Sequence, residues 1–405
     1  MNPIPADFPL ILRALRKHKI VAALVALQIA TASAIVGNGL NLLSQRLLMQ
    51  SLPTGMTEDR LLALEVDTLQ GQLDDAQREE VVAAIAAHPG VSSVSHVNAL
   101  PFTHSTSNTV ELINGDGSTH PPQTTAWLYY GSPDFLRTLG LRFVAGSNFE
   151  SVDFSADGST NFLATSKKII LSQSLARRLS VQVGSLLQIY GNSMTVIGIV
   201  ADAMPPSLAS PDDIGQVAFI PVKPTGILSS TIIVNMHSPP SDDAIADVVG
   251  IATRNTPSDF AWSARRLSDI RAQYFKMDRM IGRIVIALMA MLGLIVAGGI
   301  GGLSSYWIQR RYKQIATRRA LGACKADIAH YFHVENFIVS LVGATIGLAG
   351  AMALSLLLAR WMSLPQMPIL PPLLGGVLMI LIGQIAVYFP IRKALRVEPT
   401  TLRNG

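Results

Sequence analysis

Long stretches free of Asp, Glu, Lys, Arg and His recur along the sequence, and five of them exceed 20 residues. They are residues 20–45, 179–201, 284–309, 336–359 and 361–391. About 20 apolar residues, at a rise of about 1.5 Å per residue, cross the ~30 Å hydrocarbon core of a bilayer. We therefore predict four membrane-spanning helices, one from each stretch except 179–201.

The stretch 179–201 has the pattern of soluble β structure instead. β-branched runs such as Thr195-Val196-Ile197 lie around Gly191-Asn192, a combination typical of a β-hairpin. Its Gly, Ser, Asn and Gln residues would also suit a lipid-exposed helix poorly. We predict a hairpin with its turn at Gly191-Asn192.

Prolines divide the last stretch, 361–391. The pair Pro371-Pro372 suits the first turn of a helix, where a missing N–H costs nothing. We predict a spanning helix that starts near Leu373 and ends before Pro390, with a short exposed turn between the third and fourth spans.

The first stretch has an alternative interpretation as a cleaved signal peptide. Basic residues precede it, and Ala32-Ser33-Ala34 resembles a cleavage site. The apolar run continues to Leu43, however, beyond the ~7–15 residues of a signal-peptide core. The sequence favours an uncleaved anchor, and a mature N-terminus near Ile35 would indicate the alternative.

Basic residues gather in three short segments, which are the N-terminus, the loop after the second span and the C-terminal tail. These residues are Arg13, Arg16, Lys17, Lys19, Arg310, Arg311, Lys313, Arg318, Arg319, Lys325, Arg392, Lys393, Arg396 and Arg403. The positive-inside rule places such segments in the cytoplasm, so both termini are predicted to be cytoplasmic. The long segment 47–266 then lies outside.

The external segment is α+β in character. Its predicted helices are 76–88 and 172–180, and its predicted strands are 91–97, 168–171, 186–190, 194–200 and 231–236. Loops rich in Pro, Gly and Ser, at 114–123 and 204–213, separate them. The expected fold is an integral membrane α-helical protein with four spans in a 1+3 arrangement and a large α+β extracytoplasmic domain.

Composition excludes several classes of protein. Only 15% of residues are charged and 49% are hydrophobic, which argues against intrinsic disorder. The net charge of +5 is explained by membrane topology, so no nucleic-acid partner is expected. A single cysteine, Cys324, excludes an internal disulfide framework and a Cys-based zinc site.

A heptad seam with 3-4 spacing begins outside and continues into the second span. Its outer members, the predicted stalk seam, are Leu267, Ile270, Tyr274, Met277 and Ile281. A continuous helix 267–302 would be about 54 Å long and, together with the first span, would form a stalk that carries the external domain. The alternative is an ordinary soluble helix that abuts the membrane helix.

Two small-xxx-small pairs lie in the predicted spans. Gly298 and Gly302 form the first, and Gly343 and Gly347 form the second. Such pairs let helix backbones approach closely in a bilayer. A nucleotide-binding loop is a poor alternative for the first pair, since no strand precedes it.

Motifs of catalysis are missing from the sequence. It contains no G-x-x-x-x-G-K-[ST], no H-E-x-x-H and no G-x-S-x-G. His330 and His333 lie near Glu335 at one-turn spacing, but interfacial amphipathic residues are a better interpretation than a metal site. The spans carry no charge, which argues against an ion-coupled carrier. We predict no enzyme, no catalytic residues, no metal site and no cofactor in this chain.

The order of segments and motifs resembles the ABC transporter permeases typified by MacB, the lipoprotein-releasing permeases and FtsX. Residues 8–20 resemble the family's amphipathic entry helix, and 171–202 resemble part of its periplasmic core domain. Residues 390–394, with Pro399 and Leu402-Arg403, resemble its C-terminal signature. The resemblance covers nearly the whole chain.

The most specific motif is 314–323, similar to the family's Glu-Ile-Gly-apolar-Arg segment before Ala-Leu-Gly-Ala. The resemblance implies that this coupling segment docks on an ATPase, through residues Arg310, Arg311, Gln314, Ile315, Arg318, Arg319, Ala320, Leu321, Gly322 and Ala323. Gln314, Ala316 and Thr317 depart from the family pattern. The alternative is a basic loop that touches anionic lipid.

The resemblance implies a permease subunit of an efflux transporter that works by mechanotransmission in the bacterial inner membrane. Its expected partners are a separate ATPase that binds ATP, a second permease copy (identical or different), membrane lipid, a periplasmic adaptor and an outer-membrane channel. The alternatives are an FtsX-like regulator of a periplasmic hydrolase and a lipoprotein-releasing permease. Macrolide-like, peptide and lipidated cargos are all compatible with the sequence.

The predicted segments follow from these arguments. They are 1–46 (entry helix and first span), 47–266 (external domain), 267–309 (stalk helix and second span), 310–335 (coupling segment), 336–391 (third and fourth spans) and 392–405 (tail).

Overall fold

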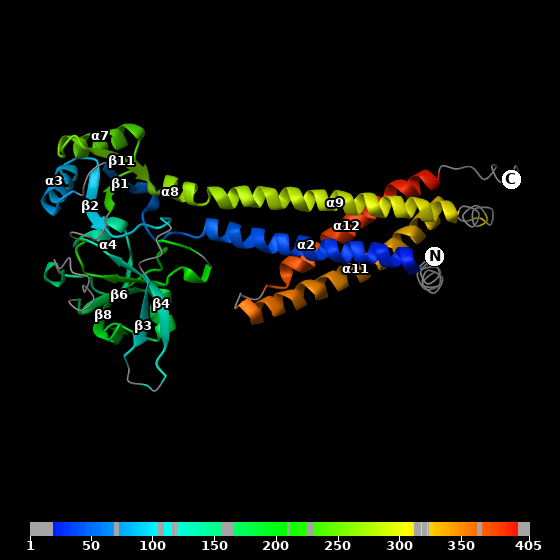
Figure 1. Cartoon of the computed structure of the whole chain (residues 1–405), viewed down its shortest axis with the longest axis horizontal. Helices are drawn as coiled ribbons and strands as arrows, with labels where there is room; N and C mark the ends of the chain where they lie inside the picture. Colours follow the sequence, from blue (N-terminus) through cyan, green and yellow to red (C-terminus); the bar gives the residue numbers. More distant parts are fainter. Residues whose placement is uncertain are drawn as a thin grey trace. The chain divides into compact units, whose positions relative to one another are not determined.

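The computed structural model describes residues 19–68, 73–103, 109–115, 118, 120–154, 166–208, 211–224, 231–311, 317, 322, 324–362 and 367–395. The chain divides into two compact units. The helical unit comprises Met1–Leu47 and Asp278–Gly405, and the α+β unit comprises Leu48–Met277. Figure 1 shows the elements of each unit along the chain.

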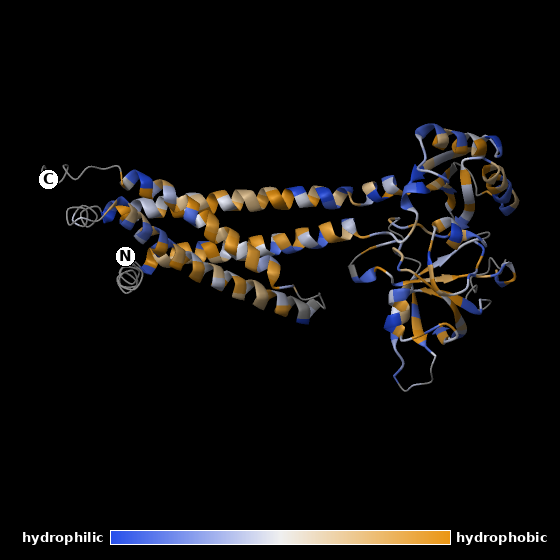
Figure 2. Ribbon diagram, turned by 180° about the vertical axis from the view of Figure 1, so that it is seen from behind, coloured by the Kyte–Doolittle hydropathy of each residue, from blue (hydrophilic) through white to orange (hydrophobic). Residues whose placement is uncertain are grey.

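Four of the described helices are long and apolar enough to cross a membrane. They are α2 (Lys19–Ser51), α9 (Lys276–Arg310), α11 (Lys325–Met362) and α12 (Leu370–Ala394). Figure 2 shows their largely apolar character. The predicted 1+3 arrangement around an α+β domain is confirmed, and the protein is a multi-pass membrane protein.

Helix α2 packs closely against α11 because glycines line the contact. A Cβ added to Gly343 would lie 2.6 Å from the carbonyl oxygen of Ala26, and one added to Gly347 would lie 2.5 Å from that of Ala30. Such approaches are impossible for a real side chain, so only glycine fits. The core of the helical unit includes Ile29, Val36, Val296, Ile300 and Met379.

Helix α12 is longer than the predicted fourth span at both ends. It starts at Leu370, with Pro in its first turn as expected, and runs through Pro390 to Ala394. The predicted end before Pro390 is wrong. Proline removes one backbone hydrogen bond and usually kinks a helix without having to end it, and the N–H of Leu395 still bonds to the carbonyl of Ile391.

The first layer of the α+β unit is an antiparallel sheet in the order β11-β1-β10-β2. Its elements are β1 (Leu61–Thr68), α3 (Asp75–Ala86), β2 (Val91–Val97), β10 (Thr231–Met236), α7 (Asp242–Arg254) and β11 (Phe260–Arg266). Two β-α-β halves in this strand order form a ferredoxin-like fold. Helices α3 and α7 share a core with one face of the sheet, which includes Leu62, Val81, Val234 and Val248.

A β-barrel is inserted between β2 and β10. Its elements are β3 (Thr109–Asn114), β4 (Gln123–Tyr130), α4 (Phe135–Leu139), β5 (Phe143–Gly146), β6 (Lys168–Ser172), α6 (Gln173–Leu179), β7 (Leu186–Ile189), β8 (Asn192–Val200) and β9 (Val217–Ile220). The strand order β5-β8-β6-β9-β4-β3-β7 closes because β7 also pairs with β8. Short 3₁₀ turns, η1 (Glu58–Arg60), η2 (Ser151–Asp153) and η3 (Pro211–Asp213), complete the unit.

The predicted hairpin is present as β7 and β8, but its turn lies one residue earlier than expected. Ile189 pairs with Asn192, so Tyr190 and Gly191 form the turn. Both have positive φ, 46° and 82°, as a tight type I′ hairpin turn requires. Asn192 suited such a position, yet the register of the flanking strands placed Tyr190 there.

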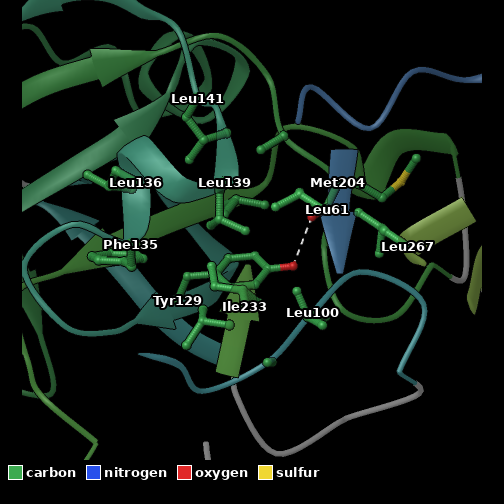
Figure 3. Close-up of a cluster of buried hydrophobic side chains, with 14 of the residues drawn as sticks. Leu61, Leu100, Tyr129, Phe135, Leu136, Leu139, Leu141, Met204, Ile233 and Leu267 are labelled. Carbon is green, nitrogen blue, oxygen red and sulfur yellow. Dashed lines mark hydrogen bonds between the residues drawn. The ribbon is translucent and has the colours of Figure 1, made fainter. Parts of the chain in front are cut away.

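A second core fills the space between the ferredoxin-like sheet and the barrel. It combines Leu61 and Ile233 from the sheet with Phe135 of α4 and Tyr129 of the barrel (Figure 3). The Tyr129 hydroxyl donates to the Met204 carbonyl oxygen at 3.0 Å. Burial raises the pKa of Tyr129 well above its usual value.

Helix α8 (Leu267–Tyr274) contributes Leu267 and Ile270 to this second core. It ends at Tyr274, and the φ of −84° and ψ of 6° at Phe275 interrupt the helix before α9. The predicted helix 267–302 is therefore interrupted at this single residue, within a helical segment that otherwise runs from Leu267 to Arg310. The reason is tertiary, because Phe275 is 2% exposed and packs in the same core.

Candidate coupling site at the end of α9

The predicted coupling segment begins where α9 ends. The structure describes Arg310, Arg311 and Gly322 of its predicted docking residues. The other members lie outside the described residues and stay predictions: Gln314, Ile315, Arg318, Arg319, Ala320, Leu321 and Ala323.

The two adjacent arginines have opposite environments. Arg310 is exposed, and its guanidinium lies 4.9 Å from the centroid of the Tyr306 ring. Arg311 is 9% exposed, and its Nη1 donates to both carboxylate oxygens of Glu335, at 3.1 and 2.9 Å. Arg310 is therefore free to meet a partner, whereas Arg311 ties the end of α9 to α11 and does not suit the predicted docking role.

Glu335 is 2% exposed, so this ion pair is buried. Taking both charges out of water costs several kcal/mol per ion, and removal of one partner leaves the other uncompensated. The pair also lies beside the face of Trp307, 5.4 Å from Arg311. It is a strong constraint on where the coupling segment can begin.

Of the three residues interpreted as interfacial, Glu335 is buried, His333 is half-buried and His330 is exposed. His333 Nδ1 lies 3.0 Å from Oε1 of Gln384 on α12, and Glu335 faces Arg311. Among the described residues, no group of three or more His, Cys, Asp or Glu could hold a metal ion. A signal was present in the sequence, since Glu335 opens a charge-free stretch and has no basic residue one turn away on its own helix.

A small cavity of about 30 Å³ borders the ion pair. Its lining includes Val25 of α2, Ser304 of α9, Glu335 and Asn336 of α11, and Val387 of α12. The four membrane helices therefore meet beside Glu335. A displacement of Arg311 would act on this common point.

Cys324 directly follows the motif 314–323 and caps α11. Its backbone N–H and its thiol both donate to Oδ2 of Asp327, each at 2.9 Å. The hydrogen bond to Asp327 raises the pKa of the Cys324 thiol. As the single cysteine of the chain, and an exposed one, it is a natural chemical probe of this region.

Helix α9 meets α2 through a face that differs from the predicted seam. Gly299 approaches Gln28, Gly39 approaches Met289, Gly282 approaches Leu43, and Arg46 pairs with Asp278. The continuation of the predicted seam is more than half exposed, at Ile284, Leu288, Met291 and Ile295.

The two glycine pairs differ in whether they pack against another helix. A Cβ added to Gly298 or Gly302 would meet no described atom within 4 Å, whereas Gly343 and Gly347 pack on α2. The Gly298 pair therefore lies on an open face of α9.

The stalk seam is divided by the break at Phe275. Leu267 and Ile270 are buried in the second core of the α+β unit, and Tyr274 packs against that core. Met277, by contrast, is 58% exposed. The outer part of the seam thus belongs to the core of the domain.

Comparison with family models gives two successive matches. Residues 21–250 match the MacB-like periplasmic core domain, and residues 286–399 match the FtsX-like permease C-terminal domain. Together they cover most of the chain, including α11, α12 and the part of α9 from residue 286 onward.

Several named proteins are similar to the chain. The uncharacterized ABC transporter permease YknZ of Bacillus subtilis is 25% identical over 293 residues, which is 69% of this chain and 70% of YknZ. The macrolide export ATP-binding/permease protein MacB of Chromobacterium violaceum is 23% identical over 286 residues, 66% of this chain but only 41% of MacB. The solved periplasmic region of MacB from Actinobacillus actinomycetemcomitans is 12% identical, covers 54% of this chain and 94% of that region, and has a TM-score of 0.35.

Proposed function

Since the chain belongs to the family of ABC transporter permeases that join a MacB-like periplasmic core domain to an FtsX-like permease domain, we propose that it is the permease subunit of an exporter driven by a separate ATPase subunit. ATP binds to that subunit, and this chain holds no cofactor of its own. The mechanism is mechanotransmission, in which movement of the coupling segment is passed to the extracytoplasmic domain.

The buried pair of Arg311 and Glu335 is the observation that carries this proposal. It fixes the start of the coupling segment to α11, at a point where the described membrane helices meet. A force on the segment after Arg311 is therefore shared by several helices and does not merely bend a loop. Packed helices respond to such forces by shifting as units.

The docking surface comprises the exposed Arg310 and the motif residues Arg318, Arg319 and Leu321. Its positive charge suits an acidic groove on the ATPase. A separate ATPase is part of the proposal because YknZ, of which the chain covers 70%, is named a permease.

Membrane orientation follows from the basic segments. The N-terminus, the coupling segment and the C-terminal tail lie in the cytoplasm, next to the ATPase, and the α+β unit lies outside the inner membrane. Export then acts on cargo that reaches the outer face, where an adaptor and an outer-membrane channel continue the path.

The open face of α9 supports a permease dimer. Its exposed apolar positions keep the 3-4 spacing of a helix-pairing seam, and Gly298 and Gly302 leave room for another backbone. Two copies, identical or different, meet along this face in the proposal.

Co-purification tests the proposed function. The chain is expressed with the ABC ATPase encoded beside it, and ATP hydrolysis is measured in nanodiscs. We expect a stable complex whose ATP hydrolysis is stimulated by the wild-type chain and lost with Arg319→Glu or Leu321→Asp.

The matched control is Arg265→Glu, which reverses an exposed charge on β11, outside the coupling segment. Failure to form a complex, or ATP hydrolysis unaffected by both coupling variants, would contradict the proposal. Binding of a cell-wall hydrolase by the α+β unit, with no adaptor bound, would instead favour the FtsX-like regulator.

A further inference from the structure

The C-terminal end of α2 is held inside the α+β unit by one arginine of α8. Nη2 of Arg271 donates to the carbonyl oxygens of Gln50 and Leu52, both at 2.7 Å. Nη1 of the same guanidinium donates to Oε2 of Glu58 at 2.7 Å. All three acceptors belong to the short passage from α2 through η1 into the first strand.

These contacts have a clear physical role. The last carbonyls of a helix have no partner within it, and a cation near them is favoured by the helix dipole. The side chains of Arg271 and Glu58 are each only 20% exposed, so the bonds are partly shielded from water. One guanidinium therefore fixes both the position and the direction in which α2 ends.

Phe102 forms the other side of the same cluster. Its ring centroid lies 5.6 Å from the Arg271 guanidinium, 5.5 Å from the ring of Tyr274 and 5.7 Å from the ring of Phe275. Its backbone has a φ of 68°, which is rare for a bulky residue, and it is 4% exposed. Such strained conformations persist only where the surroundings enforce them, and they gather at functional positions.

Tyr274 anchors the end of α8 in the same place. Its hydroxyl accepts from the Leu208 N–H at 3.0 Å and lies 3.3 Å from the Leu208 carbonyl oxygen. The helix then breaks at Phe275, and α9 begins. Helix α2 therefore ends, and α9 begins, at one cluster of side chains. These two helices are the segments that join the helical unit to the α+β unit.

We propose that this cluster, the Arg271 joint, is the rigid connection through which movement of the membrane helices reaches the extracytoplasmic domain. It consists of Arg271, Glu58, Phe102, Tyr274 and Phe275 with the carbonyls of Gln50 and Leu52. Arg271 is a positioning residue for transport, and this role rests on the proposed function. Without its guanidinium, α2 can shift while the domain stays behind.

Arg271→Ala leaves the domain core in place, because Leu267 and Ile270 of α8 remain packed there. The substitution removes three charge-assisted hydrogen bonds from the joint. We expect amide hydrogen exchange in residues 48–52 and 267–275 to accelerate about tenfold or more, with no change in the barrel strands.

The experiment uses the full chain in nanodiscs with its co-purified ATPase. In a Cys324→Ser background, spin labels at Leu48→Cys and Asp243→Cys report the distance between the end of α2 and the domain. The joint predicts one narrow distance distribution, unchanged by MgATP, in the wild type and in the matched control Arg265→Ala. Arg271→Ala is expected to broaden it, and Arg271→Lys to restore part of the narrow distribution.

A second measurement separates this role from simple folding. Fluorescent labels at Cys324 and at Asp243→Cys report movement of the domain when MgATP is added. Arg271→Ala is expected to keep ATP hydrolysis but lose most of the movement, and Glu58→Gln to lose a smaller part.

An unchanged distance distribution and unchanged movement in Arg271→Ala would overturn the joint. If the wild type itself bound no ATPase, the proposed function would fail, whereas the nucleotide-free distance distributions would still decide whether Arg271 fixes α2. If Arg271→Ala did not fold, the distances in Glu58→Gln and Arg271→Lys would make the same decision.

Discussion

Removing one partner of the buried pair between Arg311 and Glu335 should cost far more stability than removing both. Their side chains are 10% and 2% exposed, and only Nη1 of the arginine reaches the carboxylate. Nη2 is buried and has no partner among the described residues. Because only one guanidinium nitrogen bonds to the carboxylate, the attraction within the pair does little more than offset the free-energy cost of burying the two charges. A lone buried charge, by contrast, costs about 3–5 kcal/mol.

We therefore expect Arg311→Met to destabilise the full chain by about 3–5 kcal/mol, and the double variant Arg311→Met with Glu335→Leu to recover most of that loss. The assay is urea or thermal unfolding in a mild detergent, read as a double-mutant cycle. The exposed pair of Arg265 and Glu65, with side chains 45% and 43% exposed, is the control and should couple by about 1 kcal/mol or less. Additive single effects at Arg311 and Glu335 would contradict the expected coupling between the two side chains.

Three further predictions concern other parts of the chain. Burial, with a smaller contribution from Arg78, lowers the pKa of His96 from 6.5 to about 4, so the unfolded chain binds a proton more readily than the folded chain does. The free energy of unfolding should therefore fall by up to about 3 kcal/mol as the pH drops from 6.5 through 4. Melting curves of His96→Leu should lose this dependence on pH. Gly343→Leu should prevent α2 from packing and lower the melting temperature, whereas Gly298→Leu should leave the monomer stable and reduce only the dimer fraction in size-exclusion chromatography. Asp202→Ala should cost about 1–2 kcal/mol in chemical unfolding, because its carboxylate accepts from both the N–H and the hydroxyl of Ser174 at the start of α6; an unchanged midpoint would contradict this.

Much of the fold could be predicted because it rests on local pattern. Charge-free stretches found the four spans, and the predicted strands 91–97 and 231–236 coincide with β2 and β10. The break at Phe275 could not be found, since heptad spacing continues through it and only the surrounding core makes the helix stop. The same holds for Pro390, where the α12 helix tolerates a residue that usually ends one.

The candidate site was harder to predict. Arg310 and Arg311 are neighbours of the same type, and nothing local tells which of them is buried. The answer depends on Glu335, which is distant in sequence and meets Arg311 only when α9 and α11 pack. Arg271 posed the same difficulty, because its partners are backbone carbonyls of α2 and carry no signal of residue type.

Alkylation of Cys324 is the most direct test of whether an ATPase docks on the coupling segment. The full chain in nanodiscs is treated with a maleimide at pH 8, with and without its ATPase, and the rate of modification is followed by mass spectrometry. An ATPase docked on the coupling segment should protect this exposed thiol and slow its modification severalfold, and the Leu321→Asp variant should abolish that protection. An ATPase that binds the chain yet leaves the rate at Cys324 unchanged would contradict the account.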